Sequence, residues 1–108
     1  MSISAVMGIS LSGMRAQQTR LAASADNIAN ALTPGYDRRE TRLTSAAPGG
    51  VVASVAESGQ STFDDSSNVD LATEMLSLVQ SELDFRANAA VWESGADIWD
   101  VINSIKRS

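Results

Sequence analysis

The sequence predicts a mainly α-helical protein in which two long terminal helices pair as a coiled coil. An irregular middle, with at most a short β-hairpin, joins them. Three observations predict this class. Apolar residues recur at alternating spacings of four and three in both terminal regions, both prolines lie in the middle, and aromatic residues make up only 5% of the 108 residues. We expect a single domain over 1–108, with helices over 4–32 and 68–106 and an extended or looped segment over 33–67.

The first helix is predicted by a heptad series in which a single polar residue, Gln18, interrupts an apolar stripe. The stripe comprises Met7, Leu11, Met14, Gln18, Leu21, Ala25, Ile28 and Leu32. An amphipathic helix on a small core would explain part of this pattern. Regularity over more than three heptads favours a coiled-coil strand instead. Thr33-Pro34-Gly35-Tyr36 ends the helix, because Pro34 restricts Thr33 to extended geometry and Pro-Gly favours a tight turn.

The middle of the chain carries turn signals and small polar residues. Ala47-Pro48-Gly49-Gly50 marks a turn, and the flanking segments 39–43 and 51–55 are suited to two short paired strands. Residues 58–67 are small and polar, which predicts a loop.

The second helix is predicted from near Asn68, with either Ser67 or Asp70 as its cap. It carries two apolar stripes, and one partner helix can cover only one of them. The first comprises Leu71, Met75, Leu78, Glu82, Phe85, Ala89, Trp92, Ala96 and Trp99. The second comprises Leu76, Val79, Leu83, Val91, Ile98, Ile102 and Ile105. We infer that other copies or other proteins cover the remaining stripe; the alternative is that the middle segment folds over it.

Charge is divided unevenly along the chain. Residues 1–54 hold five arginines and three acids, a net charge of +2, whereas residues 55–108 hold three basic and ten acidic residues, a net charge of −7. This asymmetry predicts that opposite ends meet, within one chain or between chains. The basic cluster Arg38, Arg39 and Arg42 is suited to the acidic half of a neighbour.

The composition argues against several kinds of chemistry. With no His and no Cys, the chain cannot form a Ser-His-Asp or Cys-His nucleophile, a disulfide or a thiolate metal site. The acids around Asp64 and Asp65 break the pattern of a calcium loop, and a pI near 4.4 argues against nucleic-acid binding. We expect no catalytic residues, no metal and no cofactor. No apolar run is long enough to cross a bilayer, and the N-terminus lacks the basic region of a signal peptide.

Two terminal motifs resemble the bacterial flagellar rod and hook proteins. The first is Leu11-Ser12-Gly13-Met14, continued by Gln17-Gln18 and by Asn27-Ile28-Ala29-Asn30 running into Thr33-Pro34-Gly35-Tyr36. The second is Asn68-Val69-Asp70-Leu71, continued by Glu74-Met75 and Ala87-Asn88-Ala89. The motif residues carried over are Asn27, Asn30, Asn68, Asp70 and Asn88. With only about 35 residues between its helices, the chain is most similar to a short proximal rod protein.

The resemblance implies a structural subunit of the flagellar rod, a hollow axial shaft that self-assembles through its coiled-coil terminal helices. It implies as partners other copies of the chain, other rod proteins and the flagellar type III export apparatus, and it implies no nucleic acid and no membrane insertion. It places the protein in the basal body, in the rod that spans the periplasm, exported without a cleaved signal peptide.

The sequence assigns two sets of residues to assembly. The helix seams and interface comprise Met7, Leu11, Met14, Leu21, Ile28, Leu71, Met75, Leu78, Phe85, Trp92 and Trp99. The intersubunit segment comprises Thr33, Pro34, Gly35, Tyr36, Arg38, Arg39 and Arg42. An alternative function is a helical adaptor or regulator that binds a partner helix in a groove.

Overall fold

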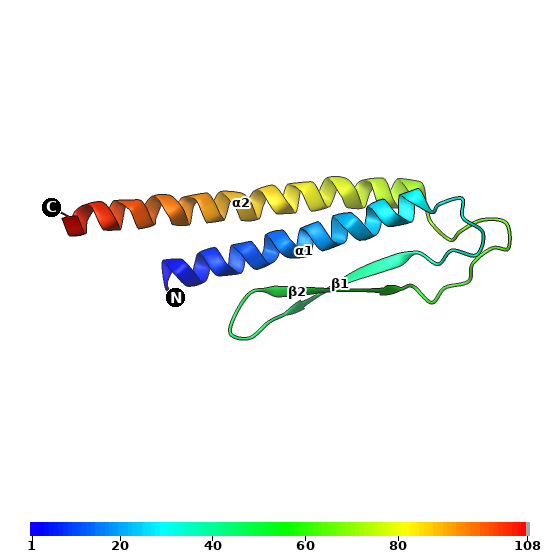
Figure 1. Cartoon of the computed structure of the whole chain (residues 1–108), viewed down its shortest axis with the longest axis horizontal. Coiled ribbons are helices and arrows are strands. Elements are labelled where there is room, and N and C mark those ends of the chain that lie inside the picture. The colour runs from blue at the N-terminus through cyan, green and yellow to red at the C-terminus, as the bar shows by residue number, and fades with distance from the viewer. Residues whose placement is uncertain (108) are drawn as a thin grey trace.

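The computed structural model describes residues 1–107, in which two antiparallel helices lie side by side and a β-hairpin flanks one of them (Figure 1). Helix α1 spans Ile3–Ala29 and helix α2 spans Leu71–Arg107. Strands β1 (Arg39–Ser45) and β2 (Val51–Glu57) form a two-stranded antiparallel sheet. The molecule is long and thin, with extents of 70 × 24 × 14 Å. The predicted fold class is confirmed, including the short hairpin.

The helix ends follow from local capping chemistry. The Ser2 side chain accepts a hydrogen bond from the Ala5 amide at the start of α1, and Asn30 caps its end with a backbone bond to the Asp26 carbonyl. At the start of α2, Asp70 Oδ1 accepts from the amides of Ala72 and Thr73, so Asp70 is the cap. The two helices begin and end within three residues of the predicted bounds.

The hairpin packs on α1 and makes no close contact with α2 within residues 1–107. Its register pairs Arg39 with Glu57 and Ser45 with Val51. At its turn, the Val51 amide donates to Ser12 Oγ at 3.1 Å, and Gly50, at φ +93°, lies against the same serine. A side chain at Gly50 would be strained and would strike Ser12. The middle segment therefore does not fold over the second apolar stripe of α2, which remains exposed along most of its length.

The contact between the two helices consists of small and polar residues. We name this contact the polar seam: Ser10, Gly13, Gln17, Ser24 and Asn27 of α1, with Glu74, Ser81, Asn88 and Gly95 of α2. The α2 members recur every seven residues, so they share one line on the helix. Small side chains allow a close approach of the two backbones. Asn88 lies directly against Gly13, and Met7 against Gly95.

Large apolar side chains contribute little to the interior. Among residues 1–107, the buried apolar residues are Ala16 and Ala23, at 3% and 7% exposure. Burial of apolar area is the main favourable term in folding, at about 25 cal/mol per Å². Two alanines bury little apolar area. Close packing of the helices and polar contacts must therefore supply much of the free energy that stabilises the isolated chain.

Gly13→Ala tests the close approach at the polar seam. A Cβ at Gly13 would lie 2.4 Å from Asn88 Oδ1, so Asn88 must move. We expect a loss of ~1–3 kcal/mol in the free energy of unfolding, measured by urea denaturation. Gly8→Ala is the matched control in the same helix, because nothing lies within 4 Å of its added Cβ. It should gain ~0.5–1 kcal/mol from helix propensity. Equal gains at both positions would contradict the close approach.

Candidate functional site

A polar junction joins all parts of the fold at one end of the helix pair. Its centre is Asn27, which is 1% exposed. The Asn27 amide nitrogen donates to Glu74 Oε1 at 3.1 Å and to the Arg39 carbonyl at 2.8 Å. Its carbonyl oxygen accepts from the Arg39 amide at 2.7 Å and from the Tyr36 hydroxyl at 3.0 Å. One side chain thus ties α1 to α2, to β1 and to the turn after α1.

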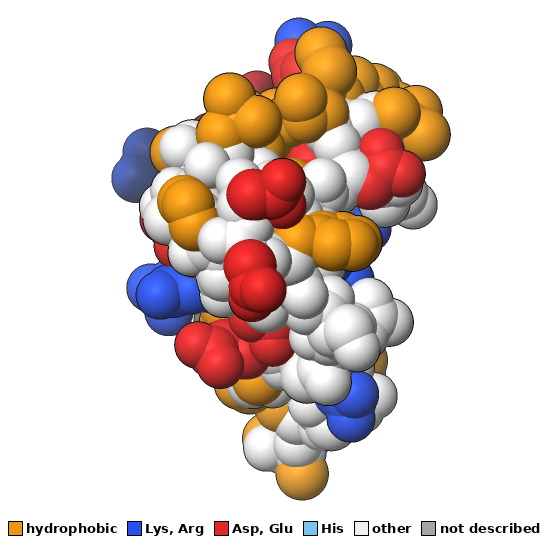
Figure 2. Space-filling view, turned by 90° about the vertical axis from the view of Figure 1, so that its right-hand side faces the viewer, with side chains coloured by type: hydrophobic (Ala, Val, Ile, Leu, Met, Phe, Trp, Pro, Cys, Tyr) orange, Lys and Arg blue, Asp and Glu red, His pale blue; other side chains and the backbone are white. Residues whose placement is uncertain are grey.

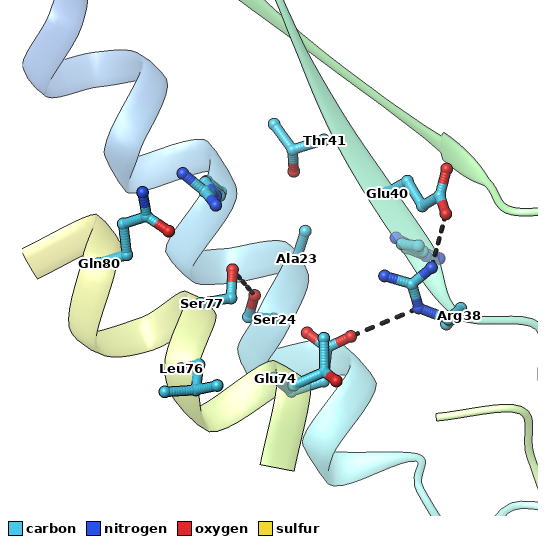
Figure 3. A pocket seen from close by; sticks show the side chains of 12 residues that line it. Ala23, Ser24, Arg38, Glu40, Thr41, Glu74, Leu76, Ser77 and Gln80 are labelled. Carbon is cyan, nitrogen blue, oxygen red and sulfur yellow. Dashed lines mark hydrogen bonds and ion pairs between the residues drawn. The ribbon is translucent and has the colours of Figure 1, made fainter. Parts of the chain in front are cut away.

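Charged groups surround this junction. Glu74 is 3% exposed, and Arg38 Nε lies 3.5 Å from its Oε1 (Figure 3). Arg38 also pairs with Glu40, and Arg39 Nε lies 3.3 Å from Asp26 Oδ2. A buried carboxyl group needs such partners, because an unpaired charge away from water is strongly destabilising. The predicted meeting of the basic and acidic halves therefore occurs inside the chain, between Arg38 and Glu74.

A second cluster ties the entry of the hairpin to its exit. Asp37 accepts hydrogen bonds from the Ser58 hydroxyl, from Asn68 Nδ2 at 2.9 Å and from the Gly59 amide at 2.9 Å. These bonds favour the ionised form and lower the pKa of the Asp37 carboxyl group. Asn68 Oδ1 also accepts from the Arg38 amide at 2.7 Å, which links the segment before α2 to β1.

Tyr36 is held in its neutral form. Burial raises the pKa of its hydroxyl, and the nearby charge of Asp26 raises it further. The hydroxyl therefore remains a donor to Asn27. The sequence predicts that Tyr36, Arg38 and Arg39 contact other subunits; in the structure they bond within their own chain, and their contact with a neighbour stays a prediction. Arg42 is exposed, with no ion pair among the described residues.

The rest of the turn is shaped by backbone bonds. Gly35, at φ +71°, donates its amide to the carbonyls of Phe63 and Ser66. Thr33 Oγ1 donates to Asn30 Oδ1 at 3.1 Å. Thr33 and Pro34 are exposed, so their assignment to contacts between subunits remains a prediction.

The predicted apolar stripes of the two helices lie together on one side of the pair. Leu21 of α1 and Leu78 and Phe85 of α2 line a common groove of about 390 Å³. Residues seven positions apart share a helix face, so the other stripe members extend this surface along the pair. We name it the apolar face: Met7, Leu11, Met14, Leu21, Ile28, Leu71, Met75, Leu78, Phe85, Trp92 and Trp99.

Apart from Met7, which lies against Gly95, the apolar face does not form the seam between the two helices of one chain, and that part of the prediction was wrong. Met7, Met14, Ile28, Leu78 and Phe85 are half-buried. The other six are exposed, Trp92 by 40% and Met75 by 60%. The contact is instead formed by the polar seam, whose residues lie on each helix directly beside the apolar stripe of that helix. Figure 2 views the loop end, where many hydrophobic side chains gather near the top, on the α2 side, with acidic and basic side chains both above and below them.

The seam residues that the sequence reasoning missed had a signal of their own. Glu74, Ser81, Asn88 and Gly95 follow the same heptad period as the apolar stripe of α2. A period alone does not show which of two adjacent stripes faces the partner helix. The family-motif residues Asn27, Asn30, Asn68, Asp70 and Asn88 all take structural roles, as bridge, caps or seam members.

Comparison with known proteins connects this geometry to a family. Residues 7–36, which form most of α1 and the turn after it, match the family model described as flagella basal body rod protein. This N-terminal region is therefore similar to the flagellar rod and hook proteins. Flagellar hook protein FlgE of Brucella abortus and of Brucella suis are each 53% identical to the chain over 45 residues. That match covers 42% of the chain and 11% of each hook protein.

The family motif and the polar junction overlap in this rod-and-hook region. Asn27 and Tyr36 both lie within the matched residues, and both bond at the junction. Within residues 1–107, no helix combines the length and the apolar character that a membrane span requires.

Asn27→Ala tests the polar junction. The change leaves the Arg39 amide and Glu74 without their partner, so we expect a loss of ~1–3 kcal/mol in the free energy of unfolding. Asn30→Ala is the control, because the Asn30 side chain bonds only within the end of α1 and the following turn. Urea denaturation followed by circular dichroism measures both. A smaller effect at Asn27 than at Asn30 would contradict the central role of Asn27.

Asp37→Asn tests the lowered pKa. A carboxyl group whose pKa is lower in the folded chain stabilises it above the ordinary pKa of 3.8, and this contribution is lost as pH falls through the folded value. The difference in unfolding free energy between wild type and variant should therefore be largest near neutral pH and shrink below about pH 4. Denaturation at a series of pH values measures it. Asp64→Asn removes the same charge outside this cluster and serves as control. A difference independent of pH would contradict the role of the ionised group.

Proposed function

We propose that this chain is a structural, non-enzymatic subunit of the bacterial flagellar rod, and that it assembles with other copies through the apolar face. The single observation that carries the proposal is the convergence of two heptad stripes on one uncovered side of the helix pair. A continuous stripe of exposed apolar side chains is typical of an interface. The match of residues 7–36 to a rod-protein family supports the flagellar setting.

The exposed second stripe of α2 supports more than one contact per chain. Leu76, Val79 and Leu83 are exposed by 56–71%. Val79 lines the groove of the apolar face, whereas Leu76 lines a cavity between α2 and β1, so exposed apolar side chains continue beyond the apolar face. A subunit with exposed apolar residues on more than one side can bind two neighbours through different surfaces. Such heterologous contacts generate closed rings or open helical assemblies rather than two-fold dimers. A hollow shaft with other rod proteins above and below it is an assembly of this kind.

We further propose that the protein lies in the basal body, in the part of the rod that spans the periplasm, and that it reaches this place through the flagellar type III export apparatus without a cleaved signal. The small apolar interior supports this route, because a chain with little buried apolar area is readily unfolded for transport. The motif shared with the hook proteins makes the hook the alternative location.

Fractionation tests the location. Basal bodies purified with and without hooks should both contain this chain if it is a rod subunit. If the chain is absent from the basal bodies that lack hooks, its location is the hook rather than the rod. A helical adaptor, the competing class, would remain in the cytosolic fraction at a small, discrete size and would contradict both structural roles.

Trp92→Ala tests the apolar face. Trp92 is 40% exposed, so its removal should change the monomer little while deleting a large contact to a neighbour. We expect the concentration needed for assembly to rise about tenfold or more, as for a central interface aromatic residue. Sedimentation velocity measures assembly and circular dichroism measures helix content. The control is Val52→Ala on the hairpin, where Val52 is 57% exposed. Unchanged assembly in Trp92→Ala would contradict the proposal.

A further inference from the structure

The groove in the apolar face has two polar atoms with no partner. Gln17 Oε1 and Ser81 Oγ are buried and make no hydrogen bond. The two residues are 7% and 1% exposed, and both line the groove beside Leu21, Leu78 and Phe85. Buried polar groups in native proteins nearly always have partners. Two unpaired atoms at one place indicate that the hydrogen bonding at this groove is incomplete in the isolated chain.

Two further polar residues border the same groove and interrupt the apolar stripes. Gln18 interrupts the stripe of α1, and Glu82 interrupts that of α2. We name Gln17, Gln18, Ser81 and Glu82 the polar band, which runs along the groove from the polar seam (Gln17, Ser81) onto the apolar face (Gln18, Glu82). One polar position within an apolar helix seam fixes the register of the strands at some cost in stability. The band is therefore suited to setting how far one copy is shifted along another.

The chemistry of the band favours a positively charged donor. Gln17 Oε1 and the Glu82 carboxyl oxygens are acceptors, and the Glu82–Arg86 ion pair at 2.7 Å is exposed to solvent and leaves acceptor capacity. A guanidinium group offers five N–H donors in a planar arrangement that suits amide and carboxyl oxygens. The ligand expected in this groove is an arginine side chain.

The chain carries such an arginine at the border of the same face. Arg15 is exposed, and within residues 1–107 its guanidinium has no hydrogen bond or ion pair. It lies one helical turn from both Leu11 and Gln18. Because Arg15 borders the apolar face, contact between the apolar faces of two copies would bring Arg15 of one copy close to the polar band of the other.

We propose that Arg15 of a second copy enters the groove between Gln17 and Glu82 and donates hydrogen bonds to both, which fixes the register between copies. This inference rests on the proposed assembly through the apolar face and adds a residue-level contact to it. The occupant is a second copy rather than an unrelated helix, because the charge that the band requires is present and unpaired on the same chain.

Charge exchange between copies tests the contact. Arg15→Glu places two acids together in every contact, and Glu82→Lys places two cations together. Each variant alone should need at least tenfold higher concentration to assemble, measured by sedimentation velocity with circular dichroism as a check on folding. In an equimolar mixture, alternating copies restore an opposite-charge pair at every contact. The mixture should therefore assemble within about twofold of the wild-type concentration.

Glu93→Lys provides the matched control for the mixture. Glu93 is an exposed acid on the same helix that does not line the groove. Glu93→Lys keeps both Arg15 and Glu82, so it should assemble as wild type alone, and in its mixture with Arg15→Glu the Arg15→Glu chains should stay largely unassembled. Equal incorporation of the Arg15→Glu chains in both mixtures, or wild-type assembly of Arg15→Glu alone, would overturn the contact while leaving assembly through the apolar face intact. Failure of the wild-type chain to assemble at any concentration would overturn both proposals.

Gln17→Met tests the unpaired acceptor separately from charge. The change retains side-chain volume and removes the acceptor, so the monomer should be at least as stable as wild type. If a second copy completes this hydrogen bond, assembly should require a severalfold higher concentration despite the added apolar surface. Assembly at or below the wild-type concentration would overturn the role of Gln17.

Discussion

The fold depends on one constraint, the close approach of two helices along a line of small and polar residues. Asn88 fits against Gly13 because no side chain intervenes, and Ser24 and Ser77 hydroxyls meet at 3.2 Å. At the loop end the same line terminates in the bonded pair of Asn27 and Glu74. Such contacts are directional, so they fix the register of the helices. Because these contacts hold the helices together, most of the large apolar side chains point away from the contact, and the apolar face is left largely uncovered.

The polar junction also positions the hairpin. Asn27 accepts from and donates to the backbone of Arg39, so β1 begins at a fixed point on α1. Asp37, Ser58 and Asn68 then close the far end of the hairpin onto the segment before α2. The residues matched to the rod-protein family include the N-terminal half of this network. The family motif therefore encodes the bend of the chain after α1 as well as a helix face.

Much of the fold could be predicted from the sequence, because heptad spacing, Pro-Gly turns and capping residues are local signals. The terminal helices, the hairpin and the exposed second stripe all followed from such signals. The face of the helix contact did not. Periodicity assigns the largest apolar residues, such as Leu21 and Phe85, to the contact, on the assumption that the chain buries them itself. Here a line of serine, glycine and asparagine packs more closely, and the roles of Asn27 and Arg38 depend on three segments that meet only in space.

The thickness of the molecule has a mechanical consequence. At 14 Å in its shortest dimension, the body of the helix pair is a single layer of helices. A load applied to a side chain on one broad surface passes through one helix backbone before it reaches the opposite surface. No compliant interior of bulky side chains lies between to absorb the displacement. A load along the long axis would therefore be carried chiefly by the backbone hydrogen bonds of the two helices, which run parallel to that axis.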